Sequence, residues 1–276
     1  MNKGQIASYT VILWSAVSCY VLASLLNTYG TVFGKEVYER RGLAAALAGL
    51  VAHAAGIVYW WTVVGHVPYM SRNEVVSSDA WVMMAAFLVF SRLYPKVGRA
   101  AVIVFPSVFL LIALSIIFTP EVRTLTPIFF SVWLIFHIGF YKIALGTIII
   151  ALAFSIFYIL KKRTRFNWLQ RLPELPVIDL YAYRFAGFGF IFWAIAMLAG
   201  SIWAYNAWGR FWGWDPVETW SLITWIVFGI YLHLRRFFRL GGEGAASFYV
   251  FCFVVTIITM FFATHSGLTV HIEYFR

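Results

Sequence analysis

Long apolar runs, repeated along almost the whole chain, constrain the fold more than any other feature of the sequence. Only 12% of the 276 residues are charged, against about 25% in soluble domains, and a membrane-spanning helix needs roughly 20 mostly apolar residues. Because hydrocarbon offers no hydrogen-bond partners, such runs must form helices that satisfy their own backbone groups. The sequence therefore predicts an all-α, polytopic transmembrane helical bundle, built as a single membrane domain over residues 1–276. We expect about eight spans, at residues 9–29, 43–65, 79–94, 98–119, 129–160, 183–205, 217–237 and 245–264.

The distribution of lysine and arginine between successive loops predicts the orientation. Cytoplasmic loops of membrane proteins carry an excess of these residues. If the N-terminus lies outside, the inner loops carry 15 of the 21 basic residues and the outer segments five, with Lys142 inside the fifth span. Both termini are then outside, as is the loop between spans six and seven. The formal net charge of +10 follows from this bias, and we do not expect nucleic-acid binding.

Tryptophan is concentrated in one short stretch of the chain. Six of the 13 tryptophans are Trp203, Trp208, Trp212, Trp214, Trp220 and Trp225. An aromatic belt at the membrane surface explains Trp60, Trp61 and Trp133 well, but it explains six tryptophans in one stretch poorly. Gly209 and Gly213 lie between them, and glycine lets the backbone approach a ligand closely. We call residues 203–225 the Trp-rich segment, and it predicts an outer surface that receives a large, flat aromatic ligand.

Two acidic residues at the end of this segment allow two interpretations. Asp215-Pro216, with Glu218 three residues after the aspartate, is typical of a helix start with a capping box and proline in the first turn. Such a cap fixes how the Trp-rich segment enters the seventh span. The alternative is a pair of catalytic acids, which we consider the weaker interpretation.

The histidines indicate what the aromatic surface binds. His137 lies near the outer end of the fifth span and His265 at the outer end of the eighth, so both are level with the Trp-rich segment. Ionisable side chains within spans are costly and are functional candidates. Imidazole is a suitable ligand for iron, and two imidazoles beside an aromatic surface predict a haem with both as axial ligands. The alternative is that each histidine is hydrogen-bonded between helices.

The remaining histidines and the cysteines carry weaker signals. His233 lies near the inner end of the seventh span and His53 near the middle of the second. His66 begins an outer loop and His271 lies in the C-terminal tail, and we expect structural roles for these two histidines and for His53. Cys19 and Cys252 lie far apart within apolar runs and form no metal-binding or CxxC pattern, so we expect core residues.

The Trp-rich segment resembles a known family signature. The run from Trp208 to Trp220, WGRFWGWDPVETW, is similar to the "WWD" signature of haem-handling proteins in cytochrome c biogenesis. Ile223-Thr224-Trp225, Tyr231-Leu232-His233, Trp133 to His137 and Thr264 to Gly267 resemble the CcsA (ResC) branch of System II, in family order. Gly65 to Pro68, with Asn73-Glu74 and Trp81, resembles a further family segment. The Asp-Pro-x-Glu-Thr-Trp form differs from the CcmC branch, and CcmF proteins are much longer.

The resemblance implies a function and a set of roles. Proteins of this branch, with the partner CcsB (ResB), move haem b to the outside and join it to apocytochrome c at Cys-x-x-Cys-His, as parts of a cytochrome c synthase in the plasma membrane. It implies that His137 and His265 ligate iron at the outer, periplasmic site. It also implies an inner haem site at His233, whose second ligand comes from CcsB, with His53 as the alternative. The haem-binding residues implied are His137, His265, His233, Trp208, Trp212, Trp214 and Asp215.

Two other readings stay open from the sequence. One is a haem transporter or chaperone that delivers haem and forms no covalent bond. The other is a transporter for an unrelated aromatic solute, which gives no reason for His137 and His265 at one face. In either haem reading Arg210 or Arg123 is a candidate partner for the propionates, because arginine pairs well with carboxylates.

Overall fold

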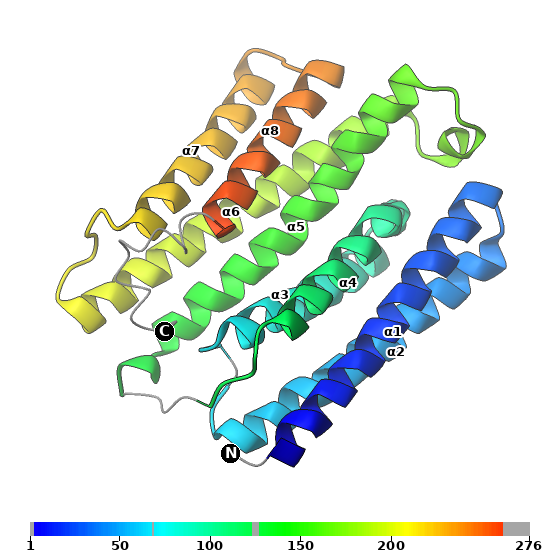
Figure 1. The fold of residues 1–276 in the computed structure, drawn as a ribbon. Coiled ribbons are helices and arrows are strands. Elements are labelled where there is room, and N and C mark those ends of the chain that lie inside the picture. The colour runs from blue at the N-terminus through cyan, green and yellow to red at the C-terminus, as the bar shows by residue number, and fades with distance from the viewer. Residues whose placement is uncertain (1–2, 68, 123–126, 262–276) are drawn as a thin grey trace. The chain divides into compact units, whose positions relative to one another are not determined.

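Eight long helices make up the structure, a computed structural model that describes residues 3–67, 69–122 and 127–261 (Figure 1). They are α1 (Lys3–Phe33), α2 (Glu36–Val64), α3 (Arg72–Leu93), α4 (Ala101–Ile117), α5 (Val132–Arg163), α6 (Leu175–Trp208), α7 (Pro216–Phe237) and α8 (Gly242–Phe261). Short 3-10 helices are η1 (Pro95–Ala100), η2 (Pro127–Phe129) and η3 (Asn167–Arg171). Each of these helices is long and apolar enough to cross a membrane; for α4 this counts η1 and α4 as one span, Pro95–Ile117. The described residues form no strand, so the predicted all-α membrane fold with eight spans is confirmed.

Four helices, α1, α2, α3 and α6, begin well before the apolar runs that predicted them, and α3 and α6 show the reason. The third span was expected from residue 79, but α3 begins at Arg72, because Ser71 and Glu74 form a capping box there. The sixth span was expected from residue 183, but α6 begins at Leu175, with Pro176 in its first turn. Helices begin where a cap satisfies the first free N–H groups, whereas hydropathy marks only the part that lies in lipid. Much of the polar stretch between the expected fifth and sixth spans, residues 161–182, is therefore helical.

The chain divides into two compact units between Leu125 and Thr126, and each is described by itself. The first unit contains α1 to α4 and the second α5 to α8. In the first unit α1 packs against α2 and α4, and α3 packs against α4. In the second unit α5 packs against α6 and α8, and α7 packs against both α6 and α8.

A buried polar network organises the first unit. The Trp60 indole is fully buried, stacks on Tyr9 at 4.7 Å between ring centroids, and donates to Glu74 Oε1 at 2.8 Å. Glu74 Oε2 accepts the backbone N–H groups of Met70 and Ser71 at 2.7 and 3.1 Å. Buried carboxylates need such donors. The network gives the family segment around Asn73-Glu74 a structural role in holding the loop before α3.

His53 belongs to the same unit and is fully buried. Its Nε2 lies 2.8 Å from Ser77 Oγ and its Nδ1 lies 3.4 Å from the Tyr20 hydroxyl. Both ring nitrogens therefore have partners on neighbouring helices. This is the hydrogen-bonded interhelical histidine that we considered as the alternative to an iron ligand.

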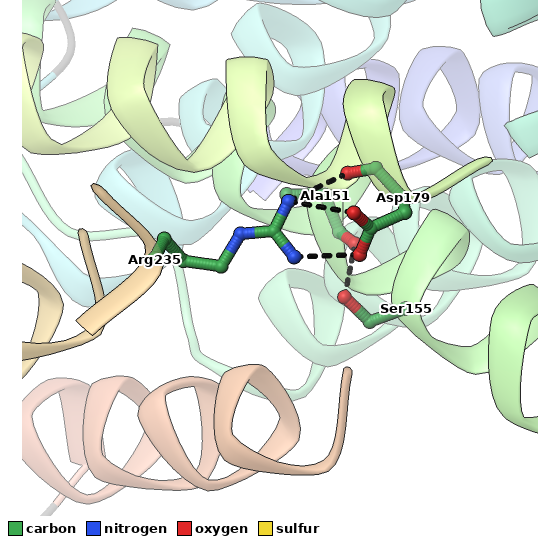
Figure 2. Close-up of polar contacts among 4 residues, drawn as sticks. All are labelled: Ala151, Ser155, Asp179 and Arg235. Carbon is green, nitrogen blue, oxygen red and sulfur yellow. Dashed lines mark hydrogen bonds and ion pairs between the residues drawn. The ribbon is translucent and has the colours of Figure 1, made fainter. Parts of the chain in front are cut away.

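Hydrogen bonds and an ion pair join the helices of the second unit at several levels along their length. The Trp193 indole donates to the Ser221 hydroxyl at 3.0 Å, joining α6 to α7. The hydroxyls of Thr224 and Thr259 lie 2.5 Å apart, joining α7 to α8. At the far end of α7 from the Trp-rich segment, Arg235 and Asp179 form a bidentate ion pair with N–O distances of 2.6 and 2.8 Å (Figure 2). The Arg235 side chain is only 8% exposed, so this pair fixes α7 to the second turn of α6.

Candidate functional site

The Trp-rich segment connects α6 to α7 through a short loop whose two ends are well defined. α6 ends at Trp208, and Gly209 caps it with φ 72°. Glycine adopts this left-handed conformation without a steric penalty, which is its usual role after a helix. At Gly213 an added Cβ would collide with the Arg210 guanidinium, which lies against this residue. The two glycines thus serve the turn and the packing of Arg210, where the sequence predicted close backbone approach of a ligand.

Asp215 and Glu218 form the predicted capping box of α7. Asp215 Oδ1 accepts the Val217 N–H at 2.9 Å, and Glu218 Oε2 accepts the Asp215 N–H at 3.2 Å. Glu218 Oε2 also accepts the Gly213 N–H at 2.7 Å. One carboxylate therefore holds the backbone on both sides of Trp214, and the interpretation of the two acids as a cap is confirmed.

Trp214 is the most unusual residue of the segment. Its φ is 56°, a conformation that is an outlier for a bulky side chain and that costs of order 1–3 kcal/mol. Its side chain is 71% exposed. The indole meets Trp212 edge to face, with ring centroids 5.9 Å apart. The Glu218 hydrogen bonds thus keep a large aromatic ring in an exposed position at the expense of local backbone strain.

The other tryptophans divide between packing and the loop. Trp203 is buried, donates to the Ile128 carbonyl at 3.1 Å and meets Trp208 edge to face at 5.1 Å. Trp225 lies on α7 and stacks on Phe190 of α6 at 4.7 Å. The six indoles therefore do not form one continuous flat platform. Edge-to-face pairs are the preferred geometry of neighbouring aromatic rings without a ligand between them.

Two indole N–H groups of this segment are buried without an acceptor among the described residues. They belong to Trp212 and Trp225. A buried donor without a partner costs about 1–3 kcal/mol, and such groups need an explanation in a native fold. An acceptor brought by a ligand is one explanation that the sequence did not predict.

His137 lies in the second turn of α5, half-buried against α6. Its Nδ1 lies 2.8 Å from the Ala196 carbonyl oxygen. A carbonyl oxygen can only accept, so Nδ1 carries a proton and donates this hydrogen bond. A metal-binding histidine typically has this arrangement, in which the second ring N–H is held by a carbonyl or carboxylate.

His233 lies on α7 sixteen residues after Val217 and is exposed on this chain. Phe237 and Phe238, both 70% exposed, lie beside its ring at centroid distances of 4.6 and 5.9 Å. Ile226 and Ile230 are exposed on the same side of the helix. The histidine therefore sits on an apolar face of α7 and not inside the second unit.

The remaining site predictions fall partly outside the described structure. His265, His271 and Arg123 lie outside the described residues. α8 is described to Phe261, and Thr259 donates to the Trp220 carbonyl at 3.2 Å, so the last turns of α8 lie beside the first turns of α7. Within the described ranges no group of three or more His, Cys, Asp or Glu side chains could hold a metal ion. Both Cys19 and Cys252 are free thiols; Cys252 is buried in the core, as expected, whereas Cys19 is half-buried.

Comparison with known proteins adds the family to this geometry. The family model described as cytochrome c assembly protein matches residues 42–271. The chain belongs to the cytochrome c assembly protein family. The match covers the Trp-rich segment and the helices that hold His137 and His233, and the expected resemblance is confirmed.

The curated relatives are proteins named cytochrome c biogenesis protein CcsA. The one from Chlamydomonas reinhardtii is 32% identical over 185 residues, covering 63% of this chain and 52% of that protein. The one from Guillardia theta is 30% identical over 243 residues, covering 76% and 78%. The one from Prochlorococcus marinus (strain MIT 9312) is 26% identical over 282 residues, covering 91% and 90%. The chain thus spans about half of the Chlamydomonas protein.

Among solved structures, the chain is similar to one named Cytochrome c Heme Lyase CcmF. The TM-score is 0.70 at 15% identity, and the match covers 93% of this chain and 46% of that chain. At this identity the likeness concerns the fold. It agrees with the all-helical membrane architecture described above.

Proposed function

We propose that this protein handles haem for cytochrome c biogenesis and, together with CcsB (ResB), attaches it to apocytochrome c at the outer membrane face. The family membership supports the general role. The observation that carries the proposal is the His137–Ala196 hydrogen bond, which orients the imidazole through Nδ1, as is typical of metal-binding histidines, on a helix that packs against α6. The two units would act as one membrane domain of System II type in the plasma membrane.

In the proposed outer site, haem b is the substrate and its iron is ligated by His137 and His265. Trp208, Trp212 and Trp214 hold the ring, and Asp215 positions the segment through the cap. The exposure of Trp214 supports this role, because a ring held open to the surroundings can stack on a porphyrin. Insertion of the ligand would replace the edge-to-face contact of Trp212 and Trp214.

Haem propionates would supply partners for three polar groups of the Trp-rich segment. The N–H groups of Trp212 and Trp225 have no acceptor among the described residues, and a carboxylate supplies strong acceptors. The Arg210 guanidinium lies against Gly213 in the same loop. We propose that some of these groups bind propionate oxygens, with Arg210 as the charged partner.

The proposed inner site uses His233 with a second ligand from CcsB. An imidazole on an exposed apolar helix face is costly in lipid, so a partner that covers this face would remove the cost. His53 is the weaker candidate, because Ser77 and Tyr20 already engage both of its ring nitrogens.

The chemistry of attachment belongs to the substrates, and the protein contributes positioning. Each cysteine thiol of the apocytochrome adds across one haem vinyl group, so that sulfur bonds to one vinyl carbon and the proton goes to the other. No oxidant or leaving group is needed. The apocytochrome histidine replaces one axial ligand, and the chain must hold the ring with its vinyl edge accessible.

Replacement of the proposed ligand tests this function. We expect that His137→Ala, purified with CcsB, loses most of its outer haem, and that added imidazole restores the haem spectrum and covalent attachment to a co-expressed apocytochrome. Phe136→Ala removes a neighbouring exposed ring and serves as the matched control. A variant His137→Ala with the haem spectrum of the unmodified protein would refute the axial assignment.

The alternative function is a haem carrier that forms no covalent bond. The same co-expression distinguishes the two, because a synthase yields cytochrome with covalently bound haem whereas a carrier yields only bound, extractable haem. Omission of CcsB in a parallel culture shows whether this chain acts alone.

A further inference from the structure

The imidazole of His137 lies directly on the backbone of α6 at Gly200. A Cβ atom built on Gly200 would lie 2.5 Å from Nδ1, 2.9 Å from Cε1 and 3.2 Å from Cγ of that ring. Real Cβ atoms essentially never approach other heavy atoms below 3.0 Å. Only glycine therefore allows the ring to occupy its observed place.

The hydrogen bond and the glycine act on the same ring from the same helix. Ala196 and Gly200 are four residues apart, so they lie one turn apart on one face of α6. The Ala196 carbonyl fixes the direction of Nδ1. A single hydrogen bond still allows the ring to rotate about the axis of that bond. Contact with the backbone of α6 at Gly200 restricts this rotation.

Other glycines of these helices differ in their surroundings, and a Cβ on Gly189 of α6 would also be crowded, at 2.8 Å from Ile148 Cγ1. A Cβ on Gly187 of α6 or on Gly139 of α5 would meet nothing within 4 Å. Glycine in a helix interior is less favourable than alanine. At Gly200 the absence of a side chain leaves the space that the His137 ring occupies.

We infer that Gly200 is a positioning residue for the outer haem site, acting through His137. It sets the depth and the plane of the imidazole and so directs Nε2 toward the iron. This inference rests on the proposed function and assigns to Gly200 and Ala196 the control of ligand geometry. Groups that orient metal ligands typically change metal affinity by about 10- to 100-fold when they are replaced.

The test compares Gly200→Ala with the matched control Gly187→Ala, each purified with CcsB. Haem content, the absorption spectrum and the reduction potential of the bound haem are measured, with and without added imidazole. We expect Gly200→Ala to lower outer haem affinity by at least about 10-fold, to shift the spectrum and the potential, and to be partly restored by imidazole. Gly187→Ala should resemble the unmodified protein in all of these.

A double variant separates positioning from folding. In a His137→Ala background there is no ring for the new Cβ to meet, so Gly200→Ala should cause no further loss of haem. If Gly200→Ala alone does not fold but Gly200→Ala with His137→Ala does, the contact is supported directly. An equal further loss in both backgrounds, or a Gly200→Ala protein that behaves like Gly187→Ala, would overturn the inference.

The outcomes also distinguish this inference from the proposed function. If His137→Ala leaves the haem spectrum unchanged, ligation by His137 itself is wrong. If His137→Ala removes the haem while Gly200→Ala leaves its content, spectrum and potential unchanged, only the role of Gly200 is wrong.

Discussion

At the scale of single residues, Glu218 fixes the backbone of the Trp-rich segment through two hydrogen bonds. Its Oε2 accepts the N–H groups on both sides of Trp214, whose backbone is left-handed. We predict that Glu218→Ala weakens the α7 cap by about 0.5–2 kcal/mol and releases Trp214. The measurement is thermal unfolding together with the fluorescence anisotropy of Trp214 in a variant with fewer tryptophans.

Glu218→Gln is the matched control for this change. Its amide oxygen still accepts from both N–H groups, so it should keep most of the cap while it removes the charge. Equal losses in the Ala and Gln variants would mean that the charge of Glu218, and not its acceptor geometry, is what matters.

The indole N–H of Trp212 gives a prediction that differs between the haem-free and the haem-bound protein. Trp212→Phe removes a buried donor without a partner among the described residues, so the haem-free protein should lose little stability from the missing hydrogen bond. If the donor binds a propionate, haem affinity should fall by about 10-fold, since hydrogen bonds to charged groups contribute about 1.5–3 kcal/mol.

Trp203→Phe provides the comparison. Its N–H already donates to the Ile128 carbonyl, so its loss should destabilise the haem-free protein first. Titration of both variants with haem, alongside thermal unfolding without haem, checks the pair. Unchanged affinity in Trp212→Phe would show that this donor does not face the ligand.

Residue patterns predicted the cap of α7 but not the contacts that fix the His137 ring. Asp215-Pro216 and Glu218 interact within one turn, so their spacing alone indicates the hydrogen bonds. The contact of His137 with Ala196 and Gly200 joins residues about 60 positions apart, and nothing in the local pattern marks that glycine. The second hydrogen bond of Glu218, from the Gly213 N–H, was not predicted, because it depends on the left-handed backbone of Trp214.

At the scale of helices, the Arg235–Asp179 pair (Figure 2) fixes α7 to α6. We predict that Asp179→Asn destabilises the protein by about 3 kcal/mol, because removal of one partner leaves a largely buried charge. This should lower the unfolding temperature in detergent by several degrees. His233 lies two residues before Arg235, so the amount of haem bound at the proposed inner site should also fall.

The Arg163–Glu243 pair joins α5 to α8 and is exposed, which makes it the matched control. Exposed ion pairs contribute little to stability, so Glu243→Gln should leave the unfolding temperature almost unchanged. A similar decrease in both variants would indicate that general surface charge, and not the buried Arg235, is responsible.

Hydropathy predicted the existence of the helices better than their ends. α3 and α6 begin several residues earlier than expected, α3 at a capping box and α6 with a proline in its first turn, both outside the apolar run. In α3 the additional first turns carry Asn73, Glu74 and Ser77, which are polar but buried. An apolarity pattern cannot show such residues, because their burial depends on partners in other helices.

At the scale of the whole molecule, the predicted orientation can be measured directly. α7 has 22 residues, about 33 Å of helix, which is enough to cross the hydrocarbon core. Phe211 and Phe238 lie before and after it and are both exposed. In a background without Cys19 and Cys252, we predict that a membrane-impermeant maleimide labels Phe211→Cys in intact cells and Phe238→Cys only after permeabilisation.

Labelling in the reverse order would show that the Trp-rich segment faces the cytoplasm, and the outer haem site would then be on the wrong side. The number of spans and their helical nature could be predicted from the sequence, because lipid leaves few alternatives. The division into two compact units could not, because it depends on which helices pack together and not on their composition.

The two halves of the proposed outer site differ in when they can form during synthesis. The bonds that shape the Trp-rich loop join residues at most five positions apart, so this loop takes its shape soon after it leaves the ribosome. His137 is made much earlier, yet its ring is fixed only when Ala196, 59 residues later, has been added and α6 has inserted. Nascent chains stalled before and after α6 should therefore differ in haem capture, because the His137 ring is fixed only once Ala196 of α6 is present.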